Sequence, residues 1–335
     1  MNYRYLGKQR LKVSAIGYGC PTFVGQLSDV DEKQAIDVLH RAIDLGVNFI
    51  DTADHNSGNN EELLAKALKG KRDQVVLTSK FGNLRGQPWA KGREVDGRPE
   101  YVPLACEASL RRLQTDAIDL YYLHRVDPQV PIADTIGAIA QLVTEGKVRH
   151  LGVSEVTPAQ LEQAAAVHPI SAVQFEWSLL WRDPEDDIVP AARRAGAGIV
   201  TYSPLGRGML TATLRRDDIA GSDFRRGDPR FQGGDLHKNL TRVAALRRVA
   251  EGVGITPAQL ALAWLLAQGP DVVPIPGTRR LDRIGQNAAA ADVVLSEAAL
   301  RSLDDAVPRA SWAGDRRSFA AVATSRRAEP APGQA

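Results

Sequence analysis

Residues 46–68, "GVNFIDTADHNSGNNEELLAKAL", contain the repeating unit of this chain in one continuous stretch. The run "VNFI" (47–50) has the composition of a buried strand, and "EELLAKAL" (61–68) has apolar residues at helical spacing. Between them lie an acid, an imidazole, amides and a glycine. A polar junction of this kind between a strand and a helix is either a simple turn or part of the rim of an active site.

The same unit recurs along the chain. Eight apolar runs, rich in β-branched and aromatic residues, alternate with amphipathic segments. Strands of a parallel sheet are buried on both faces and therefore read as nearly continuous apolar runs. Eight such strands alternating with helices predict an α/β fold, a (β/α)8 TIM barrel, whose active-site residues lie at the C-terminal ends of the strands. The predicted strands are 14–19, 47–51, 75–80, 118–124, 150–154, 172–178, 198–203 and 271–277.

Two segments depart from this alternation. The first, "YRYLGKQRLKVSAI" (3–16), predicts an N-terminal β-hairpin ahead of the barrel. The second, 205–238, is rich in Arg, Gly and Asp and is long for a connection, so we expect a functional loop before the last helices. A doubly wound sheet is the alternative topology, but no "GxGxxG" follows an early strand to support it.

Three helix starts carry residues that favour N-caps. They are Asp31, Thr157 ahead of Pro158, and Asp183 ahead of Pro184. Short polar side chains accept hydrogen bonds from the first free N–H groups of a helix, and proline suits its first turn. We expect a helix to begin after each of them.

The composition indicates a globular protein, with 44% hydrophobic and 24% charged residues in 335. We expect one barrel domain at 1–310 and a partly disordered C-terminal tail at 311–335, because the end of the chain is rich in Pro and Ala. The net charge of +2 favours neither nucleic acid nor a membrane as partner. Two cysteines and no secretory signal or membrane-spanning run predict a cytoplasmic protein acting on a small molecule, of open oligomeric state.

Three polar residues follow three successive predicted strands: Asp51, Lys80 and His124. In a parallel barrel these strand ends lie on one face, so a carboxylate, an ammonium and an imidazole converge there. Such a group can transfer protons, because the acid holds the lysine and the lysine's charge tunes its neighbours. Taken singly, each residue would be read as a buried structural residue. Three in register favour a site.

With these residues in place, the chain resembles the aldo-keto reductases, especially the bacterial branch similar to potassium-channel β-subunit-like reductases. The resemblance extends from about residue 2 to residue 310. It rests on segments such as "GVNFIDTAD" (46–54), "SLRRLQTDAIDLYYLHRVDP" (109–128), "TYSPLGRGML" (201–210) and "VVPIPGTRR" (272–280). The resemblance implies a single barrel that binds NADP(H) without a Rossmann fold, and hydride transfer between nicotinamide C4 and a carbonyl carbon.

The resemblance also implies a catalytic tetrad of Asp, Tyr, Lys and His, and one member is missing. Asp51, Lys80 and His124 match three of the four. The tyrosine is expected five residues after the aspartate, where Asn56 stands here, preceded by His55. No tyrosine lies between residues 18 and 101. The opening stretch is therefore similar to the family's active-site loop without its general acid.

The missing tyrosine changes the expected chemistry. Asn56 can donate a hydrogen bond to a carbonyl oxygen but cannot deliver a proton. General acid catalysis is typically worth about 10²–10⁴-fold, so we expect weak reduction of ordinary ketones. His124, Lys80 (directly or through a water) or His55 would replace the acid. A substrate that needs a hydride but little proton delivery, such as an iminium or a conjugated carbonyl, is the other solution.

We therefore expect an atypical NADP(H)-dependent oxidoreductase acting on a small organic carbonyl, imine or conjugated carbonyl. Two alternatives remain open. One is a catalytically weak NADP(H)-binding or regulatory protein, and the other is a non-redox lyase or isomerase that uses the same Lys–His pair. No metal-ligand spacing is present. The natural substrate and the direction of the reaction are not specified by the sequence.

The resemblance implies where the cofactor lies. The segment "VPIPGTRRLDRIGQN" (273–287) matches the turn that receives the adenosine 2′-phosphate, with Arg283 as a planar donor. Tyr202 is expected to stack on nicotinamide, and Ser154 and Gln174 to hold its carboxamide. Glu155 stands where many relatives have Asn. The full expected set is Gly19, Cys20, Asp51, Ser154, Gln174, Tyr202, Ser203, Leu205, Gly206, Arg207, Gly277, Thr278, Arg283, Gln286 and Asn287.

Four aromatic residues fall in or beside the loops at the predicted mouth: Trp89, Trp177, Trp181 and Phe224. Aromatic walls suit a flat or apolar substrate. Each is equally well a packing residue.

Overall fold

The computed structural model describes residues 1–20, 31–54, 59–84, 90, 93–219 and 223–316. Its centre is an eight-stranded parallel sheet with the strand order β10-β9-β8-β7-β6-β5-β4-β3. The (β/α)8 barrel predicted from the sequence is confirmed. The strands are β3 (Tyr18–Gly19), β4 (Phe49–Asp51), β5 (Val76–Phe81), β6 (Ile118–Leu123), β7 (Val148–Ser154), β8 (Ala172–Glu176), β9 (Gly198–Tyr202) and β10 (Val272–Pro274).

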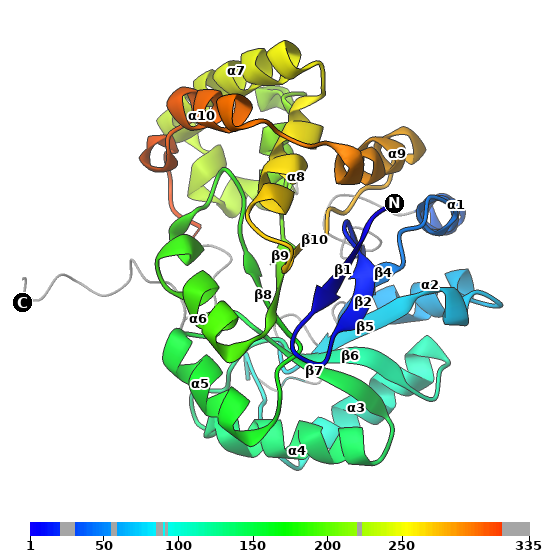
Figure 1. The fold of residues 1–335 in the computed structure, drawn as a ribbon. Coiled ribbons are helices and arrows are strands. Elements are labelled where there is room, and N and C mark those ends of the chain that lie inside the picture. Colours follow the sequence, from blue (N-terminus) through cyan, green and yellow to red (C-terminus); the bar gives the residue numbers. More distant parts are fainter. Residues whose placement is uncertain (21–30, 55–58, 85–89, 91–92, 220–222, 317–335) are drawn as a thin grey trace, which may run out of the picture.

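The sheet closes between its first and last strands. The N–H of Gly17 donates to the carbonyl oxygen of Pro274 at 2.9 Å, and that of Gly19 to Pro276 at 3.5 Å. These hydrogen bonds join the two edges, so the strands curl around a common interior (Figure 1). The C-terminal ends of all eight strands therefore lie around one mouth.

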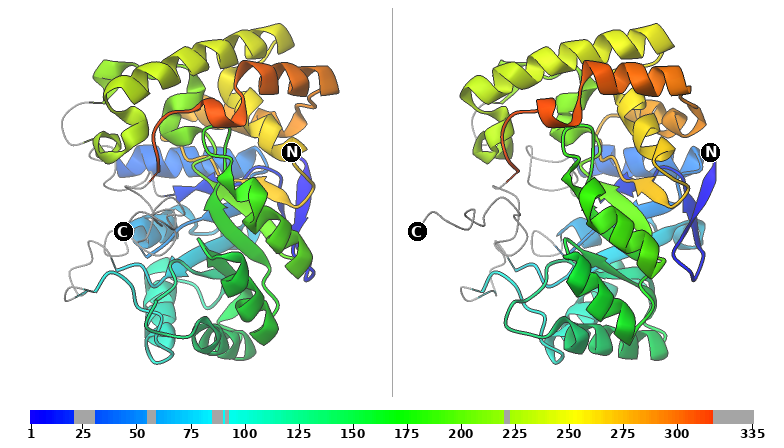
Figure 2. Two further views of the ribbon diagram at one scale, coloured as in Figure 1. Left: turned by 90° about the vertical axis from the view of Figure 1, so that its left-hand side faces the viewer. Right: turned by 60° about the vertical axis from the view of Figure 1, so that its left-hand side comes forward.

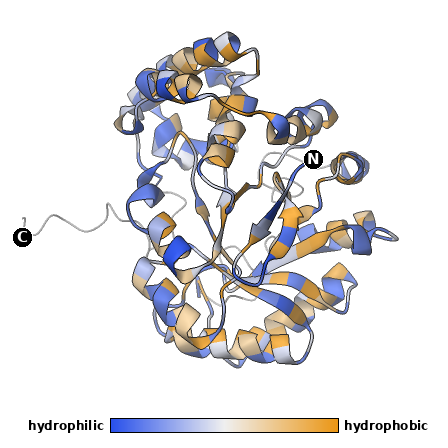
Figure 3. Ribbon diagram, viewed as in Figure 1, coloured by the Kyte–Doolittle hydropathy of each residue, from blue (hydrophilic) through white to orange (hydrophobic). Residues whose placement is uncertain are grey.

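Helices pack around the outside of the sheet, as the two turned views of Figure 2 show. Figure 3 shows hydrophobic residues running through the strands and along the helices that pack on them. The helices are α1 (Glu32–Asp44), α2 (Asn59–Ala67), α3 (Tyr101–Leu113), α4 (Ile132–Thr144), α5 (Pro158–Val167), α6 (Ile188–Ala195), α7 (Gly233–Val253), α8 (Pro257–Ala267), α9 (Leu281–Ala289) and α10 (Glu297–Ala306).

Two of the three predicted N-caps are confirmed. Asp31 accepts a hydrogen bond from the N–H of Lys33 at 2.9 Å, and Thr157 forms a capping box with Gln160. The third prediction, Asp183, is wrong. Residues 183–186 form a short 3-10 turn, and α6 begins only at Ile188, where the side chain of Asp187 accepts from the N–H of Ile188.

The predicted N-terminal hairpin covers the end of the barrel opposite the mouth. Its strands β1 (Tyr3–Leu6) and β2 (Leu11–Ser14) pair antiparallel. Leu6 and Val13 pack with residues of the barrel interior such as Tyr122 and Val273. At the turn, Gly7 has a φ of 66°, and a Cβ there would lie 2.7 Å from the carbonyl oxygen of Ser171. The tight turn of the hairpin therefore requires glycine.

Among its described residues, the segment predicted as a long loop before the last helices contains no long element ahead of α7. It contains the short 3-10 turns η5 (Gly206–Thr211), η6 (Arg216–Asp218), η7 (Phe224–Gly227) and η8 (Pro229–Phe231) before α7 begins. The side chain of Arg230 within it is fully buried. This segment extends from the end of β9 and carries charged side chains into the mouth.

Within the described ranges, no single helix is both long and apolar enough to cross a membrane. The consecutive helices α7 and α8 meet the requirement only when taken together, and the chain bends by 82° between them.

Candidate active site

Lys80 and Asp51 form a buried ion pair at the ends of two neighbouring strands. The Nζ atom of Lys80 is 2.5 Å from Oδ2 of Asp51 and 2.7 Å from the carbonyl oxygen of Thr52. Both side chains are almost fully buried. An ammonium group has three N–H donors. In the part of the chain that the structure describes, two of them have acceptors.

Asp51 also receives hydrogen bonds from two other strands. Its Oδ1 atom accepts from Oγ1 of Thr78 at 2.7 Å and from Nε2 of Gln174 at 3.0 Å. Gln174 lies on β8, four places from β4 in the sheet order, so its bond to Asp51 crosses the barrel interior. Buried polar networks of this kind hold their members in one geometry. Asp51 therefore orients Lys80 and Gln174 together.

His124 follows the next strand, β6, directly. Lys80 pairs with Tyr122 and Phe81 with Leu123, so His124 lies one residue further toward the mouth. The backbone N–H of His124 donates to the carbonyl oxygen of Phe81 at 2.8 Å, and the residue is 7% exposed. The structure thus brings Asp51, Lys80 and His124 to three adjacent strand ends.

His55 and Asn56, the other two residues expected to act here, lie outside the described residues. The chain leads to them from Asp54, whose N–H donates to the carbonyl oxygen of Lys80 at 3.1 Å. Burial raises the pKa of Asp54 well above its ordinary value, and the nearby carboxylate of Glu61 acts in the same direction. The start of this loop is therefore fixed beside Lys80.

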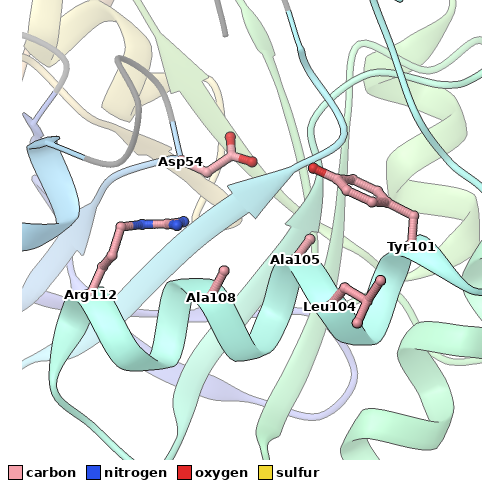
Figure 4. Close-up of a pocket in the computed structure, with 6 residues that line it drawn as sticks. All are labelled: Asp54, Tyr101, Leu104, Ala105, Ala108 and Arg112. Carbon is pink, nitrogen blue, oxygen red and sulfur yellow. The ribbon is translucent and has the colours of Figure 1, made fainter. Parts of the chain in front are cut away.

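A cavity of about 230 Å³ lies next to Asp54 on the helix side of the strands. Figure 4 shows the carboxylate of Asp54 and the hydroxyl end of Tyr101 facing each other above helix α3. None of the residues expected to bind the cofactor lines it. The cavity is lined by Asp54, Tyr101, Leu104, Ala105, Ala108 and Arg112.

Ser154, the last residue of β7, lies beside Gln174 in the middle of β8. They are paired in register, and both are almost fully buried. The Oγ atom of Ser154 accepts a hydrogen bond from Nη1 of Arg125 at 3.2 Å. The pair presents a hydroxyl and an amide next to each other, which suits recognition of a carboxamide.

Glu155 is the centre of a buried cluster beside this pair. Its Oε1 atom accepts from the hydroxyl of Tyr202 at 2.8 Å, and Arg316 donates to both carboxylate oxygens, at 2.9 and 2.6 Å. Burial alone would raise the pKa of Glu155, but the Arg316 guanidinium outweighs it and lowers the pKa to about 2. Burial and the Glu155 carboxylate raise the pKa of Tyr202. Glu155 is therefore charged and Tyr202 neutral near neutral pH.

A second group of charges continues from this cluster. Nη1 of Arg230 is 2.6 Å from Oε1 of Glu176, and its Nη2 is 2.7 Å from Oδ2 of Asp228. Arg207 lies 3.5 Å from Glu176 and 3.6 Å from Asp228. Burying an unpaired charge costs roughly several kcal/mol. Here each buried carboxylate lies next to an arginine, and this pairing offsets the cost of burying both. The network ties the long loop to the end of β8.

The backbone is strained where it turns over the mouth. Glu155, Ser203 and Arg207 have φ values of 54°, 50° and 55°, in the left-handed region that non-glycine residues rarely adopt. Gly206 has a similar φ of 55°. Strained residues of this kind concentrate at functional sites. Ser203, Leu205, Gly206 and Arg207, expected to follow a pyrophosphate, form this turn.

The other end of the expected cofactor site lies after β10. Arg283 is in the first turn of α9 with its side chain 23% exposed, and its contact with the carboxylate of Asp282 is long, at 4.0 Å. Thr278 accepts from the N–H of Arg280 through its hydroxyl at 3.2 Å. A helix N-terminus with an adjacent guanidinium favours an anionic group. Gly277 precedes Thr278, and Gln286 and Asn287 lie one turn further along α9.

Gly19 and Cys20 lie at the end of β3. Gly19 is paired in register with Asp51. Cys20 is fully buried, and burial raises the pKa of its thiol well above the ordinary value, with the Asp51 carboxylate acting in the same direction. The thiol is therefore inert at this position.

Of the four aromatic residues expected at the mouth, Trp181 lies beside the buried cluster around Glu155. The guanidinium of Arg316 sits 5.2 Å from the centre of its ring. Trp177 instead belongs to the core, 6.0 Å from the ring of Trp264 in an edge-on arrangement, so it is not a wall of the mouth. The ring of Phe224 lies 5.5 Å from the guanidinium of Arg207. Trp89 lies outside the described residues.

Sequence reasoning missed Arg316, Glu176, Asp228 and Arg230. Arg316 comes from a segment expected to lie in a tail outside the barrel, and it is 161 residues from Glu155. Glu176 ends a strand, as Asp51 does, so its position was a usable signal. Asp228 and Arg230 carry no periodic signal, because they lie in the irregular loop.

The sequence of this chain is similar to that of known proteins. The aldo/keto reductase family matches residues 15–308. "Probable aldo-keto reductase 1" of Glycine max is 45% identical over 315 residues, which are 93% of this chain and 90% of the relative.

Solved structures have the same fold. The glycerol dehydrogenase AKR11B4 of Gluconobacter oxydans has a TM-score of 0.83 and 28% identity, over 92% of this chain and 95% of its own. An aldo/keto reductase of Klebsiella pneumoniae, solved in complex with NADP and acetate, has a TM-score of 0.71 and 31% identity, over 92% and 96%.

Proposed function

The chain belongs to the aldo/keto reductase family, and on that premise we propose that it is an atypical NADP(H)-dependent oxidoreductase. Its substrate would be a small organic carbonyl, imine or conjugated carbonyl compound. The observation that carries the proposal is the buried ammonium of Lys80, which Asp51 and the carbonyl oxygen of Thr52 hold at the mouth. This is a group that can bind a carbonyl oxygen.

The residues present fit NADP(H). Arg283 and the start of α9 would bind the 2′-phosphate, because a partly exposed guanidinium at a helix N-terminus favours a dianion. Tyr202 would lie against nicotinamide, and Ser154 and Gln174 would hold its carboxamide. The related Klebsiella structure contains NADP, which supports this assignment. When bound, the cofactor would supply or accept the hydride.

Lys80 would stabilise negative charge on the substrate oxygen. Its ion pair with Asp51 would hold the ammonium in place at the mouth. A preorganised charged donor in a site from which water is excluded stabilises developing charge strongly. His124, on the adjacent strand end, would exchange a proton with the substrate or with water.

The function is atypical because Asn56 stands where the family has tyrosine. Reduction of a ketone adds a hydride to carbon and a proton to oxygen. Reduction of an iminium adds only the hydride, since the electron pair of the C=N bond neutralises the nitrogen. Conjugated carbonyls can accept the hydride at carbon and take the proton later from solvent. Substrates of these classes would depend least on the missing acid.

The test is a substrate panel with matched variants. Oxidation of NADPH would be followed by absorbance with a simple aldehyde, a ketone, a conjugated enone and a cyclic iminium. Lys80→Met and Asp51→Asn should abolish turnover of the carbonyl substrates. Lys33→Met is the control, because Lys33 is an exposed lysine paired only with Asp37 at 2.7 Å among the described residues.

Each other result has a definite meaning. Full activity of Lys80→Met on a carbonyl would show that the chemistry does not run through this site. Tight binding of NADPH without turnover of any compound would indicate a cofactor-binding or regulatory protein. Product formation without a change in the cofactor would indicate a lyase or isomerase on the same barrel.

A further inference from the structure

Arg316 reaches the mouth from outside the family domain. The family matches the chain up to residue 308, and the last described helical turn, η10, is Arg309–Ser311. The next residues turn back toward the barrel, and Arg316 ends only 8% exposed. A long charged side chain is rarely buried unless it is paired, so its partners indicate why it is there.

The short segment that carries Arg316 is attached to the barrel at two points. The buried side chain of Asn239 on α7 donates to the carbonyl oxygen of Ala313 at 2.9 Å and accepts from its N–H at 2.8 Å. Gly314 has a φ of 84°, and a Cβ there would lie 2.7 Å from the backbone nitrogen of Arg230. The attachment is therefore built into the fold, because position 314 accepts only glycine in this conformation.

At the mouth, Arg316 closes a chain of hydrogen bonds. It donates to both oxygens of Glu155, and its Nη1 atom also donates to the hydroxyl of Tyr202 at 3.2 Å. Tyr202 in turn donates to Glu155 at 2.8 Å. The hydroxyl of Tyr202 is thus held from both sides, which fixes the orientation of its ring. A two-pronged guanidinium–carboxylate contact gives this geometry, and a single ammonium does not.

The residues that Arg316 holds are those at the nicotinamide end of the proposed cofactor site. Glu155 directly follows Ser154, and its N–H donates to the carbonyl oxygen of Gln174 at 3.0 Å. Arg316 therefore contacts the neighbours of the expected carboxamide ligands and the ring expected to stack on nicotinamide. Arg283, at the adenosine end, belongs to a different element, α9.

We propose that Arg316 is a positioning residue for the nicotinamide end of the cofactor, acting through Glu155 and Tyr202. This inference rests on the proposed NADP(H) site. It means that the chain beyond the family domain completes the cofactor site, and that its contribution is confined to one end of the cofactor.

The experiment measures binding of two probes, NADPH and adenosine 2′,5′-bisphosphate, by titration calorimetry. The second probe has the adenosine end alone. Arg316→Ala should weaken NADPH by about two- to tenfold, the usual effect of having to order a side chain on binding. Its affinity for adenosine 2′,5′-bisphosphate should not change. Arg309→Ala is the matched control, because Arg309 lies in the same segment but pairs with Asp186.

A double-mutant cycle with Glu155→Gln tests whether Arg316 affects cofactor binding through Glu155. If Arg316 acts through Glu155, Arg316→Ala should weaken NADPH much less in the Glu155→Gln background than in the wild type. Arg316→Lys keeps the charge without the two-pronged contact and decides the question if Arg316→Ala does not fold.

Two results would overturn the inference. One is unchanged NADPH affinity in a folded Arg316 variant. The other is an equal loss for both probes, which would mean that Arg316 only supports the fold. A wild-type protein that binds neither probe would instead overturn the proposed NADP(H) site, and the inference with it.

Discussion

Asp51 receives hydrogen bonds from Lys80, Thr78 and Gln174, so a change at any one partner alters the placement of the others. The partners Lys80 and Gln174 contribute differently to the site. Lys80 supplies charge, whereas Gln174 fixes geometry across the barrel. Removing the carboxylate would release both at once, which is why Asp51→Asn is expected to be as damaging as loss of Lys80.

Asn56→Tyr should return a proton donor to the loop that follows Asp54. If position 56 faces the substrate carbonyl, the new hydroxyl would lie beside Lys80, whose charge favours proton release. We expect reduction of simple aldehydes to rise by about tenfold, less than the about 10²–10⁴-fold of an optimised general acid, because tyrosine is larger than asparagine by a ring and its hydroxyl must still lie within reach of the carbonyl oxygen. Steady-state kinetics on an aldehyde and on the best substrate of the panel would measure the change.

A rise on aldehydes with a fall on the preferred substrate would mean that the asparagine serves a different chemistry. No change on either, with unaltered NADPH affinity, would mean that position 56 does not face the carbonyl.

Arg283→Ala should weaken NADPH by about 1.5–3 kcal/mol, the usual range for hydrogen bonds to charged groups. NADH lacks the 2′-phosphate, so its affinity should change little. Arg280→Ala is the control, since Arg280 is already held by both oxygens of Asp282, at 3.0 and 2.7 Å. Binding titrations with both cofactors would decide, and equal losses for NADPH and NADH would refute the role of Arg283.

The site residues differ in how far the sequence reveals them. Asp51, Lys80 and His124 each lie at or next to the end of their own strand, so the periodicity of the barrel already places them on one face. Arg316 has no such signal, because its position depends on contacts with Asn239 and Glu155 far away in the sequence. Tertiary packing of an irregular segment leaves no local pattern to read.

At the scale of elements, the strands that are buried on both faces were the most predictable. The predicted strand 118–124 is observed as Ile118–Leu123. The predicted strand 271–277 is shorter, Val272–Pro274, because Pro276 has no N–H to donate to a ladder. The predicted strand 14–19 divides between β2, which ends at Ser14, and β3, which begins at Tyr18. One apolar run there serves two sheets, and periodicity does not show where the chain passes between them.

At the scale of the whole molecule, both ends of the described chain close the barrel. The hairpin covers the end opposite the mouth, and residues 313–316 contact the mouth itself. The charge cluster at the mouth therefore contributes to global stability as well as to the site. Its contribution depends on pH through Glu155.

The stability of the protein should fall in acid through Glu155. The Arg316 guanidinium lowers the pKa of this buried carboxyl from its ordinary 4.5 to about 2. The unfolded chain therefore binds a proton at a higher pH than the folded one, so the stabilisation is complete above about pH 4.5 and is lost as the pH falls toward 2. Between about pH 5 and pH 3 this carboxyl alone should account for a loss of about 2 kcal/mol.

Urea unfolding of the wild type and of Glu155→Gln at both pH values measures this contribution. The variant starts less stable, because Arg316 loses its partner, but its free energy of unfolding should fall less on acidification. Glu162→Gln, a change of an exposed carboxyl on α5, is the control. A wild type and a Glu155→Gln variant that lose the same free energy would contradict the prediction.

The hairpin at the start of the chain has a consequence for how the protein is made. Arg4 donates to the carbonyl oxygens of Leu266 and Val272, and the N–H of Lys8 donates to that of Gly196. The hairpin emerges from the ribosome well before its partners, which are synthesised only after most of the barrel. Contacts so distant in sequence form slowly, because a long loop must close before they can. The hairpin can therefore dock fully against the barrel only after the residues up to Val272 have been synthesised.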